Sequence, residues 1–93
     1  MTYLDEIARR IARLVPADLV PQDSRDLFRL YALLARSKGL AVTAEDVHDA
    51  WVAWMEARRE SHPSMVPFDE LSPAIKGEDE PFVEAIRRVA SEM

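Results

Sequence analysis

Cysteine is absent from this sequence of 93 residues, and glycine occurs only twice, at Gly39 and Gly77. Without cysteine the chain forms no disulfide bond and offers no thiolate for catalysis, which favours a reducing compartment such as the cytoplasm. Two isolated glycines cannot build the glycine-rich loop that cradles phosphate groups in many nucleotide-binding enzymes. Disulfide scaffolds, thiol enzymes and phosphate-loop enzymes are therefore excluded.

Long apolar runs are missing as well. No stretch reaches the roughly 18 consecutive apolar residues that a membrane-spanning helix needs. The first residues, Met-Thr-Tyr-Leu-Asp-Glu, lack the basic start and apolar stretch of a secretory signal. Thr2 stands where N-myristoylation requires glycine. We therefore expect a soluble, cytoplasmic protein that has no membrane anchor.

Basic residues are outnumbered by acidic ones, 12 to 17, which gives a net charge of −5. Duplex nucleic acid repels a protein of this charge unless its basic residues gather on one face. We therefore expect no nucleic acid duplex among its partners, and a DNA-binding helix-turn-helix is disfavoured. The remaining composition, 48% hydrophobic and 31% charged in 93 residues, is typical of a single folded domain.

Helical periodicity and helix-terminal signals predict an all-α protein with four helices, at about residues 2–15, 23–38, 43–59 and 79–92. The first and third begin with a threonine that can cap the helix and an aspartate three residues later, Thr2 with Asp5 and Thr43 with Asp46. The wide apolar face of the second helix predicts a central position in the core. Gly39 is expected to take the left-handed conformation that ends this helix.

Residues 60–72 carry no helical pattern, although many of their side chains are apolar. Pro63 and Pro67 remove backbone donors and fix φ, so we expect this segment to be extended. Its large side chains gain about 1.5–3 kcal/mol each on burial, so the segment should pack against the helices. Ser72 and the proline after it predict a short helical turn that ends at Gly77. The predicted fold is a compact four-helix domain with one extended, proline-bracketed segment.

Glu45, His48 and Asp49 lie at helical spacing in the third helix and are the best candidates for metal ligands. Metal sites in helical bundles take a second Glu-x-x-His pair from another helix, and the sequence has none. A solvated polar face is the favoured interpretation, and we expect no metal and no cofactor. No serine lies in a motif that pairs it with an oriented histidine. We therefore expect a non-enzymatic protein.

Five residues of the second half are candidates for binding a ligand: Trp51, Arg58, His62, Pro67 and Phe68. They would border one pocket if the 60–72 segment folds back over the third helix. Their aromatic rings would stack on the ligand, and Arg58 and His62 would meet an anionic group. Each also has a structural interpretation, since Trp51 can belong to the core and His62 can satisfy backbone groups of its loop.

Two runs of the second half carry a family resemblance: Glu45-Asp46-Val47-His48-Asp49-Ala50-Trp51, and His62-Pro63-Ser64-Met65-Val66-Pro67-Phe68-Asp69-Glu70-Leu71, followed by Glu78-Asp79. Over about residues 44–90 the chain resembles the repeat domain of ryanodine receptors, the RyR domain. Phe68 stands where that family usually has tyrosine, and the segment before His62 is shorter than in the family.

The resemblance implies a mainly helical, non-enzymatic domain. Bacterial and phage relatives in that family point to recognition of a nucleotide-like small molecule. We therefore expect a binding module for such a ligand. The alternative is a protein–protein interaction module or a homodimer that pairs through the extended segment and has no small-molecule ligand.

Overall fold

The computed structural model describes residues 1–93 and contains helices and turns but no strand. The α-helices are α1 (Tyr3–Leu14), α2 (Arg25–Ser37), α3 (Ala44–Ala57), α4 (Pro73–Gly77) and α5 (Glu80–Ser91). Short 3₁₀ helices lie at Ala17–Leu19, Gly39–Ala41 and Phe68–Glu70. The helix α4 is a single turn of five residues, so the other four are the long helices of the fold. The prediction of an all-α fold with four helices is confirmed.

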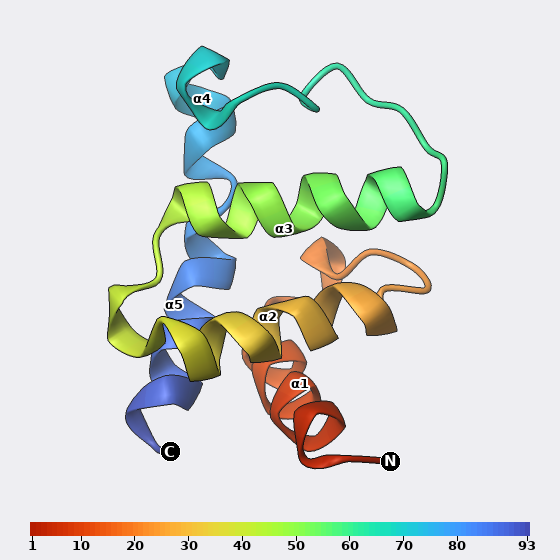
Figure 1. The fold of residues 1–93 in the computed structure, drawn as a ribbon. Coiled ribbons are helices and arrows are strands. Elements are labelled where there is room, and N and C mark those ends of the chain that lie inside the picture. Colours follow the sequence, from red (N-terminus) through yellow and green to blue (C-terminus); the bar gives the residue numbers. More distant parts are fainter.

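The helix α2 occupies the centre of the molecule, because it packs against α1, α3 and α5. In Figure 1, α2 and α3 run beside each other, α5 crosses both, and α1 lies on the far side of α2 from α3. All four long helices contribute to one buried apolar cluster, for example through Ile11, Leu27, Val47 and Ile86, each at most 1% exposed. No helix of the chain combines the length and the apolar character that crossing a membrane requires.

The predicted threonine and aspartate pairs begin α1 and α3. Thr43 Oγ1 accepts the Asp46 N–H at 3.2 Å, and the Thr43 N–H donates to the Asp46 carboxylate at 2.9 Å. At α1 the Thr2 N–H donates to the buried Asp5 carboxylate at 3.0 Å. This hydrogen bond, helped by the nearby Arg29, lowers the pKa of Asp5 against the opposing effect of burial. Local side-chain chemistry therefore sets both helix starts.

Two predicted helix boundaries lie too far out. The helix α2 begins at Arg25 rather than at residue 23, because Asp23 has a φ of 50° that no right-handed helix accommodates. The helix α3 ends at Ala57 rather than at residue 59, because Arg59 has a φ of 57°. The apolar face of α2 also extends beyond the core, since Leu33 is 48% exposed.

The segment after α3 returns along that helix, as the sequence predicted, but it is not extended throughout. The buried His48 of α3 binds the Val66 carbonyl through Nε2 at 2.7 Å, which holds the segment against the helix. Beyond Pro67 the chain forms the 3₁₀ turn Phe68–Glu70, because proline presets the φ that a helical turn needs. The predicted turn that follows is α4, where Ser72 Oγ accepts the Ile75 N–H at 3.3 Å.

Candidate functional site

The five candidate residues predicted from the sequence do not share one pocket. Trp51 and His62 line a pocket of about 510 Å³. Arg58 lines a separate groove of about 610 Å³, and Pro67 borders a third hollow of about 280 Å³. Phe68 lines none of these three. The prediction that Arg58 lies in one pocket with the aromatic residues is therefore wrong.

We call the first of these hollows the aromatic–acidic pocket, because aromatic rings and carboxylates dominate its lining. It lies where α2, α3, the loop after α3 and the start of α5 meet. Fourteen residues line it: Leu19, Pro21, Leu27, Tyr31, His48, Trp51, His62, Ser64, Ile75, Gly77, Glu78, Asp79, Pro81 and Phe82. No lysine or arginine is among them.

Five rings form the wall of this pocket. The Trp51 ring meets His62 edge to face, with centroids 5.4 Å apart, and lies 5.8 Å from the His48 ring. On the other side, Tyr31 and Phe82 have centroids 5.7 Å apart. Helical spacing places His48 and Trp51 on the same face of α3, three residues apart. The remaining rings come from three other parts of the chain: Tyr31 from α2, His62 from the loop after α3 and Phe82 from α5.

His48 is fixed in place rather than free to turn. Its ring is 3% exposed, and Nε2 lies 2.7 Å from the Val66 carbonyl oxygen. A carbonyl only accepts, so Nε2 carries a proton and donates it to the Val66 oxygen. This contact joins the wall of the pocket to the returning segment.

Tyr31 places a polar atom in an otherwise apolar environment. The residue is 2% exposed on α2, and its side chain lines the pocket. Its hydroxyl takes part in none of the hydrogen bonds within the protein and is not among the buried polar atoms that lack a partner, so the oxygen remains accessible from the pocket. Burial, together with the negative charge of Asp79, raises the pKa of Tyr31, so the hydroxyl stays neutral.

Asp79 is the half-buried carboxylate of the pocket, and no ion pair within the chain includes it. Burial raises its pKa to about 6, His48 opposes this shift, and the neighbouring carboxylates Glu78 and Glu80 add to it. A carboxyl with a raised pKa in a concave site is typical of functional positions. Asp79 is therefore the group in this pocket whose charge is least satisfied by the protein itself.

The loop residues His62 and Ser64 close one side of the pocket. The Ser64 N–H donates to His62 Nδ1 at 3.0 Å, which orients the exposed imidazole ring toward Trp51. The Ser64 hydroxyl, in contrast, forms no hydrogen bond to either histidine of the pocket. The arrangement therefore lacks the hydrogen-bonded nucleophile and base that covalent catalysis uses.

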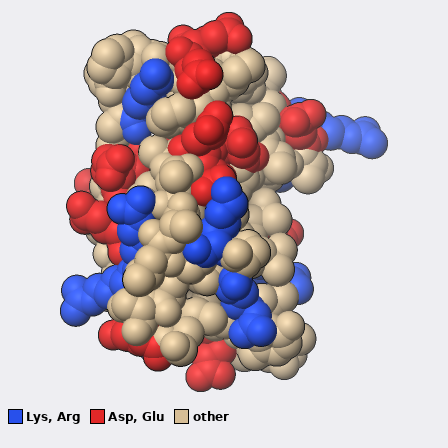
Figure 2. Space-filling model, turned by 60° about the vertical axis from the view of Figure 1, so that its left-hand side comes forward, with Lys and Arg blue, Asp and Glu red and all other residues tan.

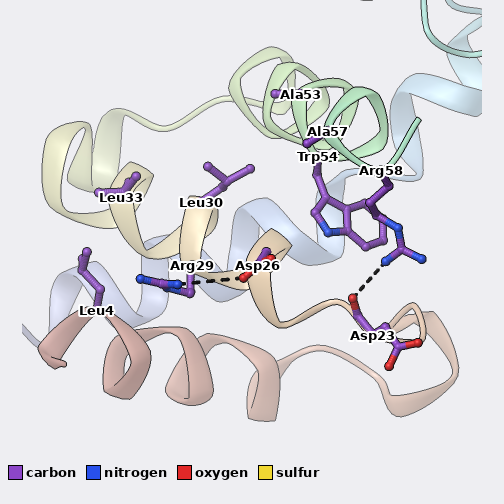
Figure 3. Close-up of a pocket in the computed structure, with 10 residues that line it drawn as sticks. All are labelled: Leu4, Asp23, Asp26, Arg29, Leu30, Leu33, Ala53, Trp54, Ala57 and Arg58. Atoms are coloured by element: carbon purple, nitrogen blue, oxygen red, sulfur yellow. Dashed lines mark hydrogen bonds and ion pairs between the residues drawn. The ribbon is translucent and has the colours of Figure 1, made fainter. Parts of the chain in front are cut away.

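The groove that contains Arg58 is larger, but its charged groups are already paired (Figure 3). The Arg58 guanidinium stacks 4.3 Å above the Trp54 ring, donates to the Asp23 carbonyl at 2.9 Å and pairs with Glu60 at 3.0 Å. Arg29 faces Asp5 at 3.4 Å and Asp26 at 3.9 Å. Because these partners hold the guanidinium groups, the groove offers no free cation for an anionic ligand.

The metal-ligand alternative has no support in the fold. His48 is buried against Val66, whereas Glu45 and Asp49 are exposed on α3. No group of three or more histidine, aspartate or glutamate side chains lies together in a way that would hold a metal ion.

Charged residues of both signs are interspersed on the surface shown in Figure 2, and no continuous basic area covers this face. The salt bridges have the same mixed character, for example Arg10 with Glu92 at 2.9 Å and Lys38 with Asp46 at 3.1 Å. This face therefore offers no basic surface of the kind that a duplex would need.

Sequence reasoning missed three residues that the pocket brings together: Tyr31, His48 as a wall of the pocket, and Asp79. One feature of the sequence pointed to Tyr31, because its hydroxyl is a polar group on the apolar face of a central helix. His48 was considered only as a metal ligand, and its spacing from Trp51 was the missed signal. Asp79 had no local signal, because its burial depends on how α5 packs.

Comparison with known proteins corrects the family resemblance. Residues 2–91 match the family described as "Domain of unknown function (DUF7701)", and no RyR repeat family is found. No curated protein and no solved structure matches the chain. The resemblance to the ryanodine receptor repeat is therefore wrong. It rested on short runs in half of the chain, where a helix cap and a proline-bracketed loop favour similar residues in unrelated proteins. The chain belongs to the DUF7701 family.

Proposed function

We propose that this protein is a non-enzymatic binding module whose aromatic–acidic pocket holds a small organic molecule. The observation that carries the proposal is the convergence of the Tyr31, Trp51 and Phe82 rings and the half-buried Asp79 carboxylate on one pocket. Ligand sites are typically concave, largely apolar and equipped with a few polar groups that fix orientation. A pocket of about 510 Å³ with an aromatic wall, a free hydroxyl and one half-buried carboxylate fits that description.

The structure does not favour an anionic ligand in this pocket. The anionic part of the predicted ligand was assigned to Arg58 and His62. Only His62 lines this pocket, because Arg58 lies in the other groove, where Asp23 and Glu60 hold it. The nucleotide-like ligand followed from the ryanodine receptor resemblance, which is wrong. The proposed ligand is therefore a small aromatic or aliphatic molecule without phosphate groups.

A binding role fits the site better than catalysis does. General acid–base work by Asp79 and His48 would require both groups to reach one reacting atom. His48 already uses Nε2 to hold the backbone at Val66, and Ser64 has no activating base. The location that the absence of cysteine predicts is the cytoplasm.

A fragment screen by isothermal calorimetry and thermal shift tests the proposal. The screen includes aromatic amines, aliphatic amines, neutral aromatics and, as the contrasting class, mono- and cyclic nucleotides. We expect binders that are lost when Trp51→Ala removes the ring between His48 and His62. Arg58→Ala in the other groove is the matched control and should leave binding intact. Binders that depend on Arg58 but not on Trp51, or no binders at all, would contradict the proposal.

The alternative of an interaction module or homodimer is favoured by one observation. Several large apolar side chains are exposed, including Tyr3 at 62%, Leu33 at 48% and Leu40 at 64%. They lie on α1, α2 and the turn after α2, not in the 60–72 segment through which pairing was predicted. Light scattering at high micromolar concentration decides between a monomer and a dimer. A dimer that Leu33→Ser dissociates would support this alternative.

A further inference from the structure

We propose that the ligand of the aromatic–acidic pocket carries a positive charge, as a quaternary ammonium or protonated amine group. The inference rests on the proposed function and adds the chemical class of the ligand. It follows from the rings, the charges and the unpartnered polar atoms that meet in this one pocket.

The rings that line the pocket do not lie in a single stacking plane. Trp51 and His62 stand nearly perpendicular, at 85°, with centroids 5.4 Å apart. Tyr31 and Phe82 are inclined at 50°, with centroids 5.7 Å apart. The electron-rich faces of aromatic rings attract a cation within about 6 Å of the centroid. Rings at steep angles to one another surround a compact cationic group better than they hold a flat one.

The carboxylates of the pocket favour a cation. Glu78 and Asp79 line it, Glu80 is close enough to raise the pKa of Asp79, and neither lysine nor arginine is part of the lining. The nearby Lys76 points its ammonium at the Phe68 ring, 5.3 Å from the centroid, and is not part of the pocket lining. An anion in this position would face carboxylates, and no lysine or arginine would pair with it.

Two polar groups of the pocket lack a partner that a cation would supply. The Asp79 carboxylate is half-buried and forms no ion pair within the chain, and removing a carboxylate from water without a partner is costly. The Tyr31 oxygen lines the pocket without a hydrogen bond inside the protein, so it can accept from the N–H of a protonated amine, whereas a quaternary ammonium has no N–H and would be held by the rings and the carboxylate alone. The raised pKa of Asp79, about 6, agrees with a carboxyl whose burial outweighs its interaction with His48.

The test compares two molecules of nearly equal shape, choline and its uncharged analogue 3,3-dimethyl-1-butanol. Titrations at pH 7.5 are followed by the ring-current shifts of the ligand methyl protons and of the Trp51 indole. We expect choline to bind at least about tenfold more tightly, because only its trimethylammonium group attracts ring faces and carboxylates. Asp79→Asn should reduce this preference severalfold, whereas Asp49→Asn, at an exposed position of α3, should leave it unchanged.

The pH dependence gives a second readout. The preference for choline should shrink as the pH falls through about 6, because protonation removes the charge of Asp79. His48 and His62 also line the pocket, and protonation of either would act in the same direction. In Asp79→Asn the preference for choline should depend less on pH, because the variant has no carboxyl at this position. Circular dichroism confirms that the variant is folded.

The outcomes separate this inference from the proposed function. Equal binding of the two molecules, or binding of neither, overturns the cationic class. In that case the fragment screen with Trp51→Ala still decides the proposed function, since neutral fragments that depend on Trp51 would uphold it. Preferential binding of choline that survives in Asp79→Asn at every pH would also overturn the inference, because the carboxylate would then have no part in it.

Discussion

At the scale of single residues, the carboxyl of Asp79 sets the character of the pocket. Its raised pKa has a physical origin in burial and in the neighbouring Glu78 and Glu80, which His48 only partly offsets. Asp5 and Asp46 show the opposite behaviour. Although burial raises the pKa of Asp46, hydrogen bonds from Thr43 and Lys38 outweigh it and lower the value. Backbone hydrogen bonds at the helix starts therefore stabilise the charged form of Asp5 and Asp46, whereas Asp79 has no such hydrogen bond.

The first prediction concerns Asp79→Asn and the dependence of stability on pH. Because the folded-state pKa is raised from 3.8 to about 6, the folded protein holds more protons at this site between those values. The contribution of Asp79 to the free energy of unfolding is therefore greatest at low pH and is lost as the pH rises through this window. The variant should be more stable than the wild type at pH 7 by about 1 kcal/mol, since water screens a half-buried carboxylate.

Urea unfolding of both proteins at pH 4, 5, 6 and 7 checks this prediction. Comparing the two cancels the contributions of Asp5 and Asp46, whose lowered pKa values make stability rise with pH. The advantage of the variant should grow from pH 4 to 6 and then level off. A constant difference across this range would show that the Asp79 carboxyl does not titrate as described.

The second prediction concerns the Tyr31 hydroxyl. Because this hydroxyl faces the pocket and forms no hydrogen bond within the protein, Tyr31→Phe should leave stability unchanged or raise it by up to about 1 kcal/mol. The same change should weaken the binding of any ligand that contacts the hydroxyl. Tyr3→Phe is the matched control, because Tyr3 is 62% exposed. A loss of stability above about 1 kcal/mol would mean that the Tyr31 hydroxyl has a partner in the folded protein.

At the scale of elements, the sequence contained the information for helix starts and for one helix end. The Thr43 and Asp46 pair acts within one turn, so its hydrogen bonds follow from local spacing. The late start of α2 and the early end of α3 were missed, since nothing in the residue types of Asp23 and Arg59 required a positive φ. The Asp23 carbonyl accepts a hydrogen bond from Arg58, a contact between distant parts of the chain that local sequence does not reveal.

The third prediction compares the two glycines. Gly39 has a φ of 56° after α2, whereas Gly77 does not have a positive φ, and a Cβ at either position would meet no neighbouring atom. Gly39→Ala should therefore cost about 1 kcal/mol through backbone strain alone. Gly77→Ala should be neutral or slightly stabilising. Thermal unfolding of both variants provides the comparison, and equal melting temperatures would argue against the left-handed turn at Gly39.

At the scale of the whole molecule, the pocket exists only because distant parts of the chain converge. His48 and Trp51 share a helix face, but Tyr31 comes from α2, His62 from the loop and Asp79 from the start of α5. Two of the five predicted binding residues, Trp51 and His62, line this pocket because they flank the point where the segment returns. Arg58 lies in another groove because α3 ends before it and turns its side chain onto Trp54. Periodicity predicts which helix face is buried, but not which faces of separate helices meet.

The two tryptophans of the chain provide the most direct test of the pocket. Trp51 lines the aromatic–acidic pocket, and Trp54 lines the groove with Arg58, so their indole N–H signals report on the two sites separately. A ¹H–¹⁵N spectrum should be recorded during titration with the strongest binder from the fragment screen. We predict that the Trp51 indole signal shifts in a saturable manner while the Trp54 signal stays in place. A shift of the Trp54 signal alone, or of neither, would contradict the assignment of the binding site.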